Sequence, residues 1–243
     1  MISNKIIKFP QLESTNNYLI KNLHLDNGTV IVTDNQYAGH GSGKNTWESA
    51  ANKNLTFSIL LKPTSLEVSN QFFLNIIISL AIQHYVIDTG IQNCKIKWPN
   101  DIYVNDKKLC GILINNTIMA TTINTVVAGI GININQKQFT SNAPNPTSLT
   151  NLTNQKYSLE KELNKIIKYI NHYFNALERH DFQIIKEEYL NNLYRKDTVQ
   201  NYIFEGKKIK ALIRGISEFG LLILEETDGT LHTCDFKQVK YII

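Results

Sequence analysis

The sequence predicts an α+β fold, in which helices cover a sheet of apolar strands and a small β-barrel follows at the C-terminus. Three observations support this prediction. Apolar residues recur at helical spacing over residues 69–88 and 158–178. Runs rich in β-branched residues, such as 29–33 and 55–61, alternate with helical segments. From about Lys196 only short strands are expected, so we predict one domain over residues 1–195 and a second over 196–243.

Composition limits the class of protein. The chain has 243 residues, 42% of them hydrophobic, and can therefore bury a large core. Its net charge of +4 is too small to indicate a nucleic-acid-binding protein, which would normally show a concentrated basic stripe. The charge is compatible with an acidic partner or a phosphate-bearing substrate. The three cysteines form no CxxC motif, which favours free thiols over a zinc site or a disulfide framework.

The sequence shows no recognisable targeting segment. Its N-terminus lacks the apolar stretch and cleavage site of a signal peptide. The most apolar segment, residues 72–82, is shorter than the roughly 20 residues of a membrane-spanning helix. We therefore expect a soluble, cytoplasmic protein.

Local patterns place the remaining elements. A strand at 5–9 precedes a short helix that Ser14 or Thr15 can cap, and further strands are expected at 95–98 and 125–135. Residues 142–154 are predicted to form a polar loop, and a last helix is predicted near 182–194. The barrel strands are expected at 198–204, 207–215, 221–225, 231–235 and 239–243, with hairpin turns at Glu205-Gly206 and Asp228-Gly229.

A hairpin over residues 97–114 carries the first candidate site. Its turn at residues 105–107 separates strands 102–104 and 108–114, and strict alternation would put Lys108 and Cys110 on one face and Leu109 and Gly111 on the other. A lysine is unusual at the start of so apolar a strand. A glycine inside the strand indicates either a bulge or a ligand that approaches the backbone closely.

Polar side chains stand at the start of the first helix. A cap explains one hydroxyl of Ser14 and Thr15, because a helix leaves its first N–H groups without partners. Ser14, Thr15 and Asn16 together are three adjacent hydrogen-bonding side chains, and they could also hold a small polar ligand group. The residues alone leave both interpretations open.

A glycine-rich loop follows the second strand. Gly39, Gly41 and Gly43 permit positive φ and could turn successive N–H groups towards an anion. The spacing is not that of a P-loop, and no helical pattern follows, as a dinucleotide fingerprint requires. The loop is therefore either a flexible connection or a phosphate cradle of another kind, with Trp47 as a stacking surface for a flat ring.

The strand at 125–135 contains a stretch without side chains. Gly129 and Gly131 fall on the same face as Asn133 by alternation. This face either permits a close strand crossing or leaves room for a flat ligand that one amide could bind.

Together these motifs resemble those of the biotin protein ligases over nearly the whole chain. The resemblance rests on Glu13-Ser14-Thr15-Asn16, on Gly39-x-Gly followed by Trp47, on Lys97-Trp98-Pro99-Asn100-Asp101, on Lys108 with Gly111-Ile112-Leu113, and on Gly129-Ile130-Gly131-Ile132-Asn133. It implies a class II synthetase-like catalytic domain, with a mixed sheet flanked by helices, and a C-terminal SH3-like barrel. The chain begins close to the first catalytic strand, so we expect the monofunctional type without an N-terminal DNA-binding domain.

The resemblance implies a reaction in two steps. Biotin and ATP, with Mg²⁺, form biotinyl-5′-adenylate and pyrophosphate. The adenylate then acylates one lysine of the biotin carboxyl carrier domain of a biotin-dependent carboxylase. No nucleic-acid or membrane partner is expected.

The resemblance also assigns the site residues. Lys108 would contact the biotin carboxylate and the α-phosphate, and Asp101 would orient or deprotonate the acceptor amine. Biotin binding is expected at Ser14, Thr15, Asn16, Gln36, Gly39, His40, Lys108, Gly111 and Gly129. Nucleotide binding is expected at His40, Gly41, Ser42, Trp47, Asn100, Lys108 and Asn133. The glycine-rich loop would close over the intermediate and exclude water.

One departure from the family pattern stands out. The family loop usually carries arginines where this chain has His40 and Ser42, which leaves Lys44 as the fixed cation of the loop. Histidine cannot reproduce the bidentate fork of arginine. We therefore hypothesise that this loop retains the adenylate less firmly.

Three other functions are weaker interpretations. A lipoate ligase would share the fold and the lysine, but the polar set at residues 14–16 favours a ureido ring over an aliphatic dithiolane. A non-catalytic biotin-binding protein would not need Lys108. An RNA-binding barrel is disfavoured because acidic residues over 218–228 dilute its positive charge.

Overall fold

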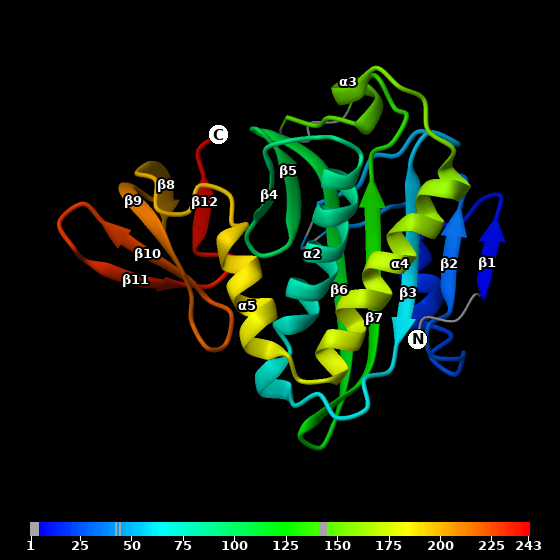
Figure 1. Ribbon diagram of the computed structural model, residues 1–243, viewed down its shortest axis with the longest axis horizontal. Coiled ribbons are helices and arrows are strands. Elements are labelled where there is room, and N and C mark those ends of the chain that lie inside the picture. Colours follow the sequence, from blue (N-terminus) through cyan, green and yellow to red (C-terminus); the bar gives the residue numbers. More distant parts are fainter. Residues whose placement is uncertain (1–4, 42, 44, 141–144) are drawn as a thin grey trace.

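The computed structural model describes residues 5–41, 43, 45–140 and 145–243, and it contains two sheets (Figure 1). The larger sheet has seven strands in the order β1-β2-β3-β7-β6-β5-β4. They are β1 (Ile6–Phe9), β2 (Val30–Thr33), β3 (Leu55–Leu61), β7 (Thr122–Ile132), β6 (Lys107–Met119), β5 (Asp101–Val104) and β4 (Cys94–Lys97). Only β1 and β2 pair in parallel, so the sheet is mixed, as expected.

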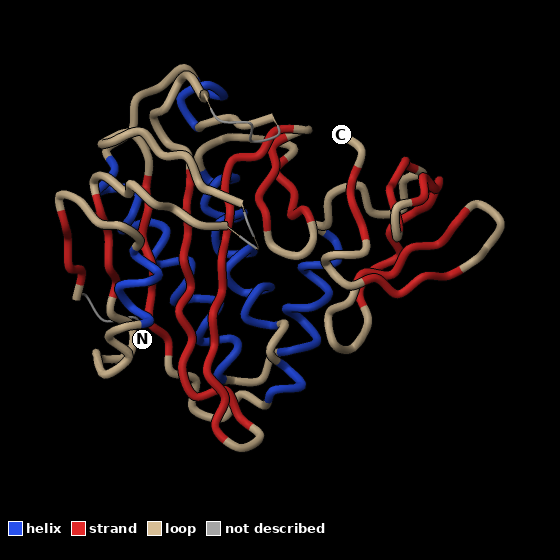
Figure 2. The backbone as a smooth tube through the Cα atoms, turned by 180° about the vertical axis from the view of Figure 1, so that it is seen from behind, coloured by secondary structure: helices blue, strands red, loops and turns tan. Residues whose placement is uncertain are grey.

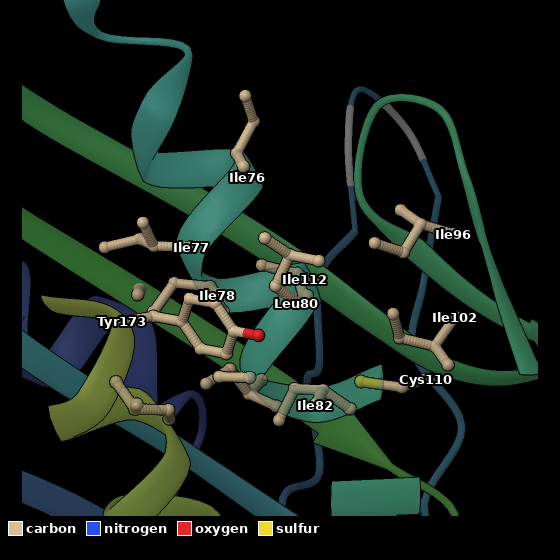
Figure 3. Packing of buried hydrophobic residues seen from close by; sticks show 14 of the residues in the cluster. Ile76, Ile77, Ile78, Leu80, Ile82, Ile96, Ile102, Cys110, Ile112 and Tyr173 are labelled. Carbon is tan, nitrogen blue, oxygen red and sulfur yellow. The ribbon is translucent and has the colours of Figure 1, made fainter. Parts of the chain in front are cut away.

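Three helices cover one face of this sheet (Figure 1). They are α2 (Phe73–Asp88), which a 3₁₀ turn η1 (Val68–Asn70) precedes, α4 (Leu159–Glu178) and α5 (Phe182–Asn191). Helix α2 is apolar around most of its circumference because it is enclosed between the sheet and the two outer helices. Figure 3 shows Ile77 and Leu80 of α2 in one cluster with Ile112 of β6 and Tyr173 of α4.

The burial of α2 explains a misleading feature of the sequence. By length and composition alone, residues Val68–Asp88 could cross a membrane, although the shorter apolar segment 72–82 had suggested otherwise. Most of this stretch is buried inside the fold, where its apolar side chains form the main core. It is therefore a core helix of this structure.

The opposite face of the sheet carries the short helix α1 (Thr15–Ile20), which is visible from behind in Figure 2. Leu19 of α1 packs on Ile31, Leu60 and Val127, which alternate along their strands with residues of the main core. Ser14 is the N-cap, and its hydroxyl accepts a hydrogen bond from the N–H of Asn17. Helix α1 thus holds residues 14–16 against the centre of the sheet.

The structure departs from the expected elements in three main places. The strand expected at 125–135 is β7, which begins and ends three residues earlier than expected. Residues 149–153, expected in a loop, form the short helix α3 (Leu149–Thr153), which Ser148 caps. Strand β6 extends five residues beyond the expected end at Ile114 because it pairs with β7 over residues 110–119. The expected loop residues 142–144 lie outside the described residues.

The C-terminal sheet is antiparallel, with the order β11-β10-β9-β8-β12, and agrees with the expected SH3-like barrel. Its strands are β8 (Gln200–Phe204), β9 (Lys207–Ile216), β10 (Leu222–Glu226), β11 (Leu231–Cys234) and β12 (Val239–Tyr241). The predicted turns occur, with positive φ at Glu205, Gly206 and Gly229. All three cysteines are buried as free thiols, and burial raises the pKa of Cys94 to about 12, so this thiol stays protonated near neutrality.

The barrel packs on the N-terminal end of α2 through a turn that contains Gly220. This glycine has a φ of +83°, and a Cβ placed there would clash with the ring of Phe72. Gly229, in another turn of the barrel, has a φ of +92°, but a Cβ added there would meet nothing within 4 Å. The two glycines therefore have the same backbone requirement and different surroundings.

We expect Gly220→Ala to lower the free energy of unfolding by about 3 kcal/mol, because left-handed strain and overpacking add. The matched control Gly229→Ala should lose about 1 to 2 kcal/mol from strain alone. Urea unfolding followed by circular dichroism measures both. Equal losses would show that the contact between Gly220 and Phe72 does not constrain the barrel.

Candidate active site

A cavity of about 290 Å³ opens on the face of the sheet that carries α1. It brings together most of the residues expected at a site: Ser14, Thr15, Asn16, Gln36, His40, Gly41, Trp47, Asn100, Asp101, Lys108, Gly111 and Gly129. Gly39 and Asn133 do not line it, and Ser42 and Lys44 lie outside the described residues. Five motifs that are far apart in the sequence thus meet in one cavity.

At one end of the cavity, Thr15 belongs to a buried hydrogen-bond network. Its hydroxyl lies 2.8 Å from the hydroxyl of Ser58, and its backbone N–H donates to Oε1 of Gln36 at 2.9 Å. Gly39 permits this arrangement, since a Cβ there would lie 2.7 Å from Nε2 of Gln36. Gly39 therefore leaves room for the side chain of Gln36, although Gly39 itself does not line the cavity.

Asn16 presents an unused acceptor beside this network. Its amide nitrogen donates to Oδ1 of Asn115 at 2.9 Å, whereas its Oδ1 is buried and has no partner among the described residues. The amide lies directly over Gly129, where a Cβ would come within 3.0 Å of Oδ1. A buried carbonyl oxygen without a donor is costly, so this atom is suited to an N–H group of a ligand.

Trp47 packs on the part of the sheet where Gly111 and Gly131 carry no side chains. A Cβ on Gly131 would lie 2.5 Å from the indole Nε1, and a Cβ on Gly111 would lie 3.0 Å from Cζ3. The indole N–H is buried and also lacks a partner among the described residues. Gly111 and Gly129 were both expected at the biotin site, but they have different neighbours. Gly111 and Gly131 accommodate Trp47, whereas Gly129 accommodates Asn16.

Lys108 and Asp101 form an ion pair in the lining, with 2.6 Å between Nζ and Oδ2. Both side chains keep about a quarter of their surface exposed, at 24% and 25%. The ammonium also lies 5.9 Å from the centre of the Trp47 ring. The cavity therefore holds a fixed cation that is partly desolvated and has a carboxylate as its partner.

The alternation predicted for this hairpin is wrong. Tyr103 pairs with Lys108 and Ile102 with Cys110, so Leu109 is an extra residue in a β-bulge. The bulge places Lys108 and Gly111 in the same cavity, whereas Leu109 and Cys110 are both buried in the core. Gly111 does mark a close approach to the backbone, as one of the two interpretations held, because Trp47 packs on it. The bulge lies at Leu109, two residues before this glycine.

The glycine-rich loop is a small hairpin in its described part. The N–H of Gly41 donates to the carbonyl of Asn45, and the N–H of Trp47 donates to the carbonyl of Gly39. Of the three glycines, only Gly43 has a positive φ. Strand-like pairing therefore uses the N–H of Gly41, one of the donors expected to face an anion. The remainder of the expected series stays a prediction.

Asn133 does not reach the cavity. Its amide nitrogen donates to the carbonyl of Thr147 at 2.9 Å, while its Oδ1 is buried without a partner among the described residues. The N–H of Thr147 in turn donates to the carbonyl of Lys108. The side-chain alternation predicted for this strand does not extend to Asn133, because β7 ends at Ile132. Asn133 instead holds the segment around Thr147 in place beside Lys108.

The sequence interpretation missed several lining residues, of which Asn75 and Phe236 are the most informative. Asn75 of α2 accepts a hydrogen bond from Nδ2 of Asn100 at 2.6 Å, and its only signal was that it interrupts an apolar helix. Phe236 comes from the barrel and has no sequence signal. No group of three or more His, Cys, Asp or Glu side chains suited to a metal ion occurs among the described residues.

The comparisons with known proteins agree with this geometry. The family described as "Biotin/lipoate A/B protein ligase family" matches residues 8–133. The bifunctional ligase/repressor BirA of Bacillus spizizenii is 30% identical over 222 residues, covering 86% of this chain and 65% of that protein. The chloroplastic biotin–protein ligase 1 of Arabidopsis thaliana is 27% identical, covering 93% of this chain and 64% of the relative.

A solved structure supports the fold. The biotin protein ligase of Aquifex aeolicus, in complex with biotin and ATP, superposes with a TM-score of 0.83 at 24% identity, covering 99% of this chain and 100% of that one. The chain spans 65% of the length of the BirA relatives from Bacillus spizizenii and Bacillus subtilis. The family match covers more than half of the chain and includes every cavity motif before the barrel, so the chain belongs to the biotin/lipoate A/B protein ligase family.

Proposed function

We propose that this protein is an ATP-dependent biotin ligase, which forms biotinyl-5′-adenylate and transfers the biotinyl group to a lysine of a biotin carrier domain. The observation that carries the proposal is one cavity with an unpaired acceptor at Asn16 and a fixed cation at Lys108. The first matches a ureido N–H group, and the second matches a carboxylate. The relatives named as biotin–protein ligases support the same assignment.

The end of the cavity near α1 is the proposed ureido site. Oδ1 of Asn16 would accept from a ureido N–H, and the hydroxyls of Ser14 and Thr15, with Gln36, complete a polar surface. An aliphatic dithiolane would leave these buried groups without partners, which costs free energy. This argument favours biotin over lipoate as the acid.

Lys108 is the proposed catalytic cation of the first step. A carboxylate oxygen of biotin attacks the α-phosphorus of ATP, and pyrophosphate leaves with the electrons of the broken P–O bond. The ammonium would offset the negative charge gathered by the two anions. For this it must exchange Asp101, its partner at 2.6 Å, for the substrate oxygens.

The same exchange prepares the second step. When Lys108 turns to the adenylate, the Asp101 carboxylate loses its cationic partner and can accept a proton. The acceptor amine attacks the acyl carbon, AMP leaves with the anhydride oxygen, and the amine proton passes to Asp101. The ion pair thus makes the base available only after the acyl group is activated.

The nucleotide would bind at the Trp47 end of the cavity, with Asn100 and the loop residues His40 and Gly41 around it. The free indole N–H of Trp47 is one available donor. Mg²⁺ fits a site of this kind, since it prefers phosphate and water oxygens and needs few protein carboxylates. Asp101 is the carboxylate in the described lining, and it would neutralise part of the charge of the ion.

We expect purified protein to release pyrophosphate from ATP in the presence of biotin, and Lys108→Ala to slow this release by about a hundredfold, the usual scale for one oriented charge-stabilising group. The neighbouring Lys107 is exposed and does not line the cavity, so Lys107→Ala is the matched control with normal activity. Release with lipoate but not biotin would instead assign the chain to the lipoate branch of the family. A Lys108→Ala rate close to that of the control would remove Lys108 from the mechanism.

Two glycines that are two residues apart on β7 should separate the ligands. Gly129→Ala places a Cβ against Asn16 and should weaken biotin binding by about tenfold or more, because overpacking costs about 1 to 3 kcal/mol. Gly131→Ala should displace Trp47 and weaken binding of a non-hydrolysable ATP analogue to a similar degree. Isothermal titration of each variant with each ligand tests this prediction. Equal effects of both substitutions on both ligands would contradict the assignment of the two ends.

His40 offers a test of how firmly the intermediate is held. We expect His40→Arg to slow the escape of biotinyl-5′-adenylate severalfold, since the guanidinium can clamp a phosphate in a bidentate manner. Release of radiolabelled adenylate from preloaded protein measures this rate. An unchanged rate would show that the histidine in this loop does not weaken retention.

A further inference from the structure

A second groove lies among the helices that cover the other face of the sheet, away from the active-site cavity (Figure 1). Its lining comes from α2, α4 and α5, and we call it the helix groove. Its volume of about 630 Å³ is within the range of small-molecule sites. The helix groove shares no lining residue with the active-site cavity, so it is a separate feature of the molecule.

Five side chains of the helix groove carry rings: His84, Tyr85, Tyr169, His172 and Tyr173. The centre of the His84 ring lies 5.6 Å from that of Tyr173 and 6.5 Å from that of Tyr169. The His172 ring meets Tyr173 edge to face, with 5.1 Å between the centres. Contacts of this kind join the rings of α2 and α4 into one wall, against which a flat ring can pack.

Carboxylates hold these rings in fixed positions. The hydroxyl of Tyr173 donates to Oε1 of Glu188 at 2.7 Å, and Nε2 of His84 lies 2.7 Å from the same oxygen. Burial and this hydrogen bond raise the pKa of Tyr173, so its hydroxyl stays a donor. The hydroxyl of Tyr169 donates to Oδ2 of Asp88. The wall is therefore organised before a ligand arrives, which lowers the entropy cost of binding.

The groups of the helix groove that have no partner are donors. Lys165 pairs with Glu162 at 3.1 Å, whereas the ammonium of Lys168 has no hydrogen bond or ion pair among the described residues. The ring nitrogens of His172 also have no hydrogen-bond partner in the described part of the chain. Lys168 and His172 are four residues apart on α4, so their side chains lie on the same side of that helix.

We propose that the helix groove is a second ligand site, which binds a flat ring that carries an acidic group. The ring packs on His84, Tyr169 and Tyr173, and the acidic group accepts hydrogen bonds from Lys168 and His172. An exposed lysine alone would be an ordinary solvated side chain, and the rings alone would be ordinary packing. Together, in one groove of this volume, they match the two parts of such a ligand. Carboxylate and phosphate esters of aromatic rings share this chemistry.

Histidine signals can locate a ligand on this protein without any measurement of catalysis. The chain has six histidines, so the imidazole groups of ¹⁵N-histidine-labelled protein can be followed by NMR during titration with 2-naphthoate and with 2-naphthyl phosphate. We expect saturable shifts at His84 and His172 and none at His24 and His232, which do not line the helix groove. The probe that binds more tightly identifies the acidic group.

Two results of this titration would overturn the proposal. One is the lack of a saturable shift at His84 and His172 with either probe. The other is a shift confined to His40, which lines the active-site cavity, because it would show that the acids bind there instead. Because the two sites share no residue, protein that fails to bind biotin would remove the proposed function and leave this titration valid.

A pair of lysine variants tests the acidic group separately from the ring. Lys168→Gln should raise the Kd of 2-naphthoate about fivefold, the upper scale of an exposed ion pair, and should leave the Kd of uncharged 2-naphthamide unchanged. Lys161→Gln is the matched control, since Lys161 is also exposed on α4 and does not line the helix groove. His172→Ala should weaken both probes because it removes part of the wall. Equal Kd values of 2-naphthoate in Lys168→Gln and Lys161→Gln would exclude the proposed contact and overturn the assignment.

Discussion

The candidate site depends on a part of the central sheet that has no side chains. Gly111 and Gly131 are direct partners across β6 and β7, and Gly129 lies two residues along β7 on the same face. Only this bare surface lets an indole ring and an amide approach the backbone of a sheet so closely. With ordinary side chains at these positions, Trp47 and Asn16 could not lie where they do, and the cavity would be filled.

Glycines weaken a strand, so the surrounding structure has to hold this surface rigid. Strand β6 pairs with β7 far beyond the site, and the reverse face of both strands packs on α2. Cys110 and Ile112 flank Gly111 in the sequence and point into that core, as Figure 3 shows. The apolar helix that resembles a membrane span is thus the support that allows the opposite face to remain bare.

The sequence was sufficient for features that depend on neighbouring residues. The N-cap at Ser14, the hairpin turns of the barrel and most strand limits are local, and each follows from a few side chains. The bulge at Leu109 could not be read locally, because it depends on how Tyr103 and Lys108 align across two strands. The position of Phe236 was equally hidden, since the residues beside it in the cavity are more than a hundred positions away in the chain. Asn133 shows the same limit: its neighbours suggested a ligand, whereas its hydrogen bond goes to Thr147.

The segment 97–101 connects these observations. The sequence motif suggests a ligand contact for its polar end, Asn100 and Asp101, but it suggests no role for Lys97 and Trp98. In the structure these two residues have definite partners, Tyr241 and Gly220, in the C-terminal barrel. α5 adds a third support, because the buried hydroxyl of Tyr189 donates to the carbonyl of Pro99 at 2.7 Å. The ion pair between Asp101 and Lys108 therefore stands at the end of a segment held by the sheet, by a helix and by the barrel, so a shift of any of these three would move the groups that the proposed chemistry requires.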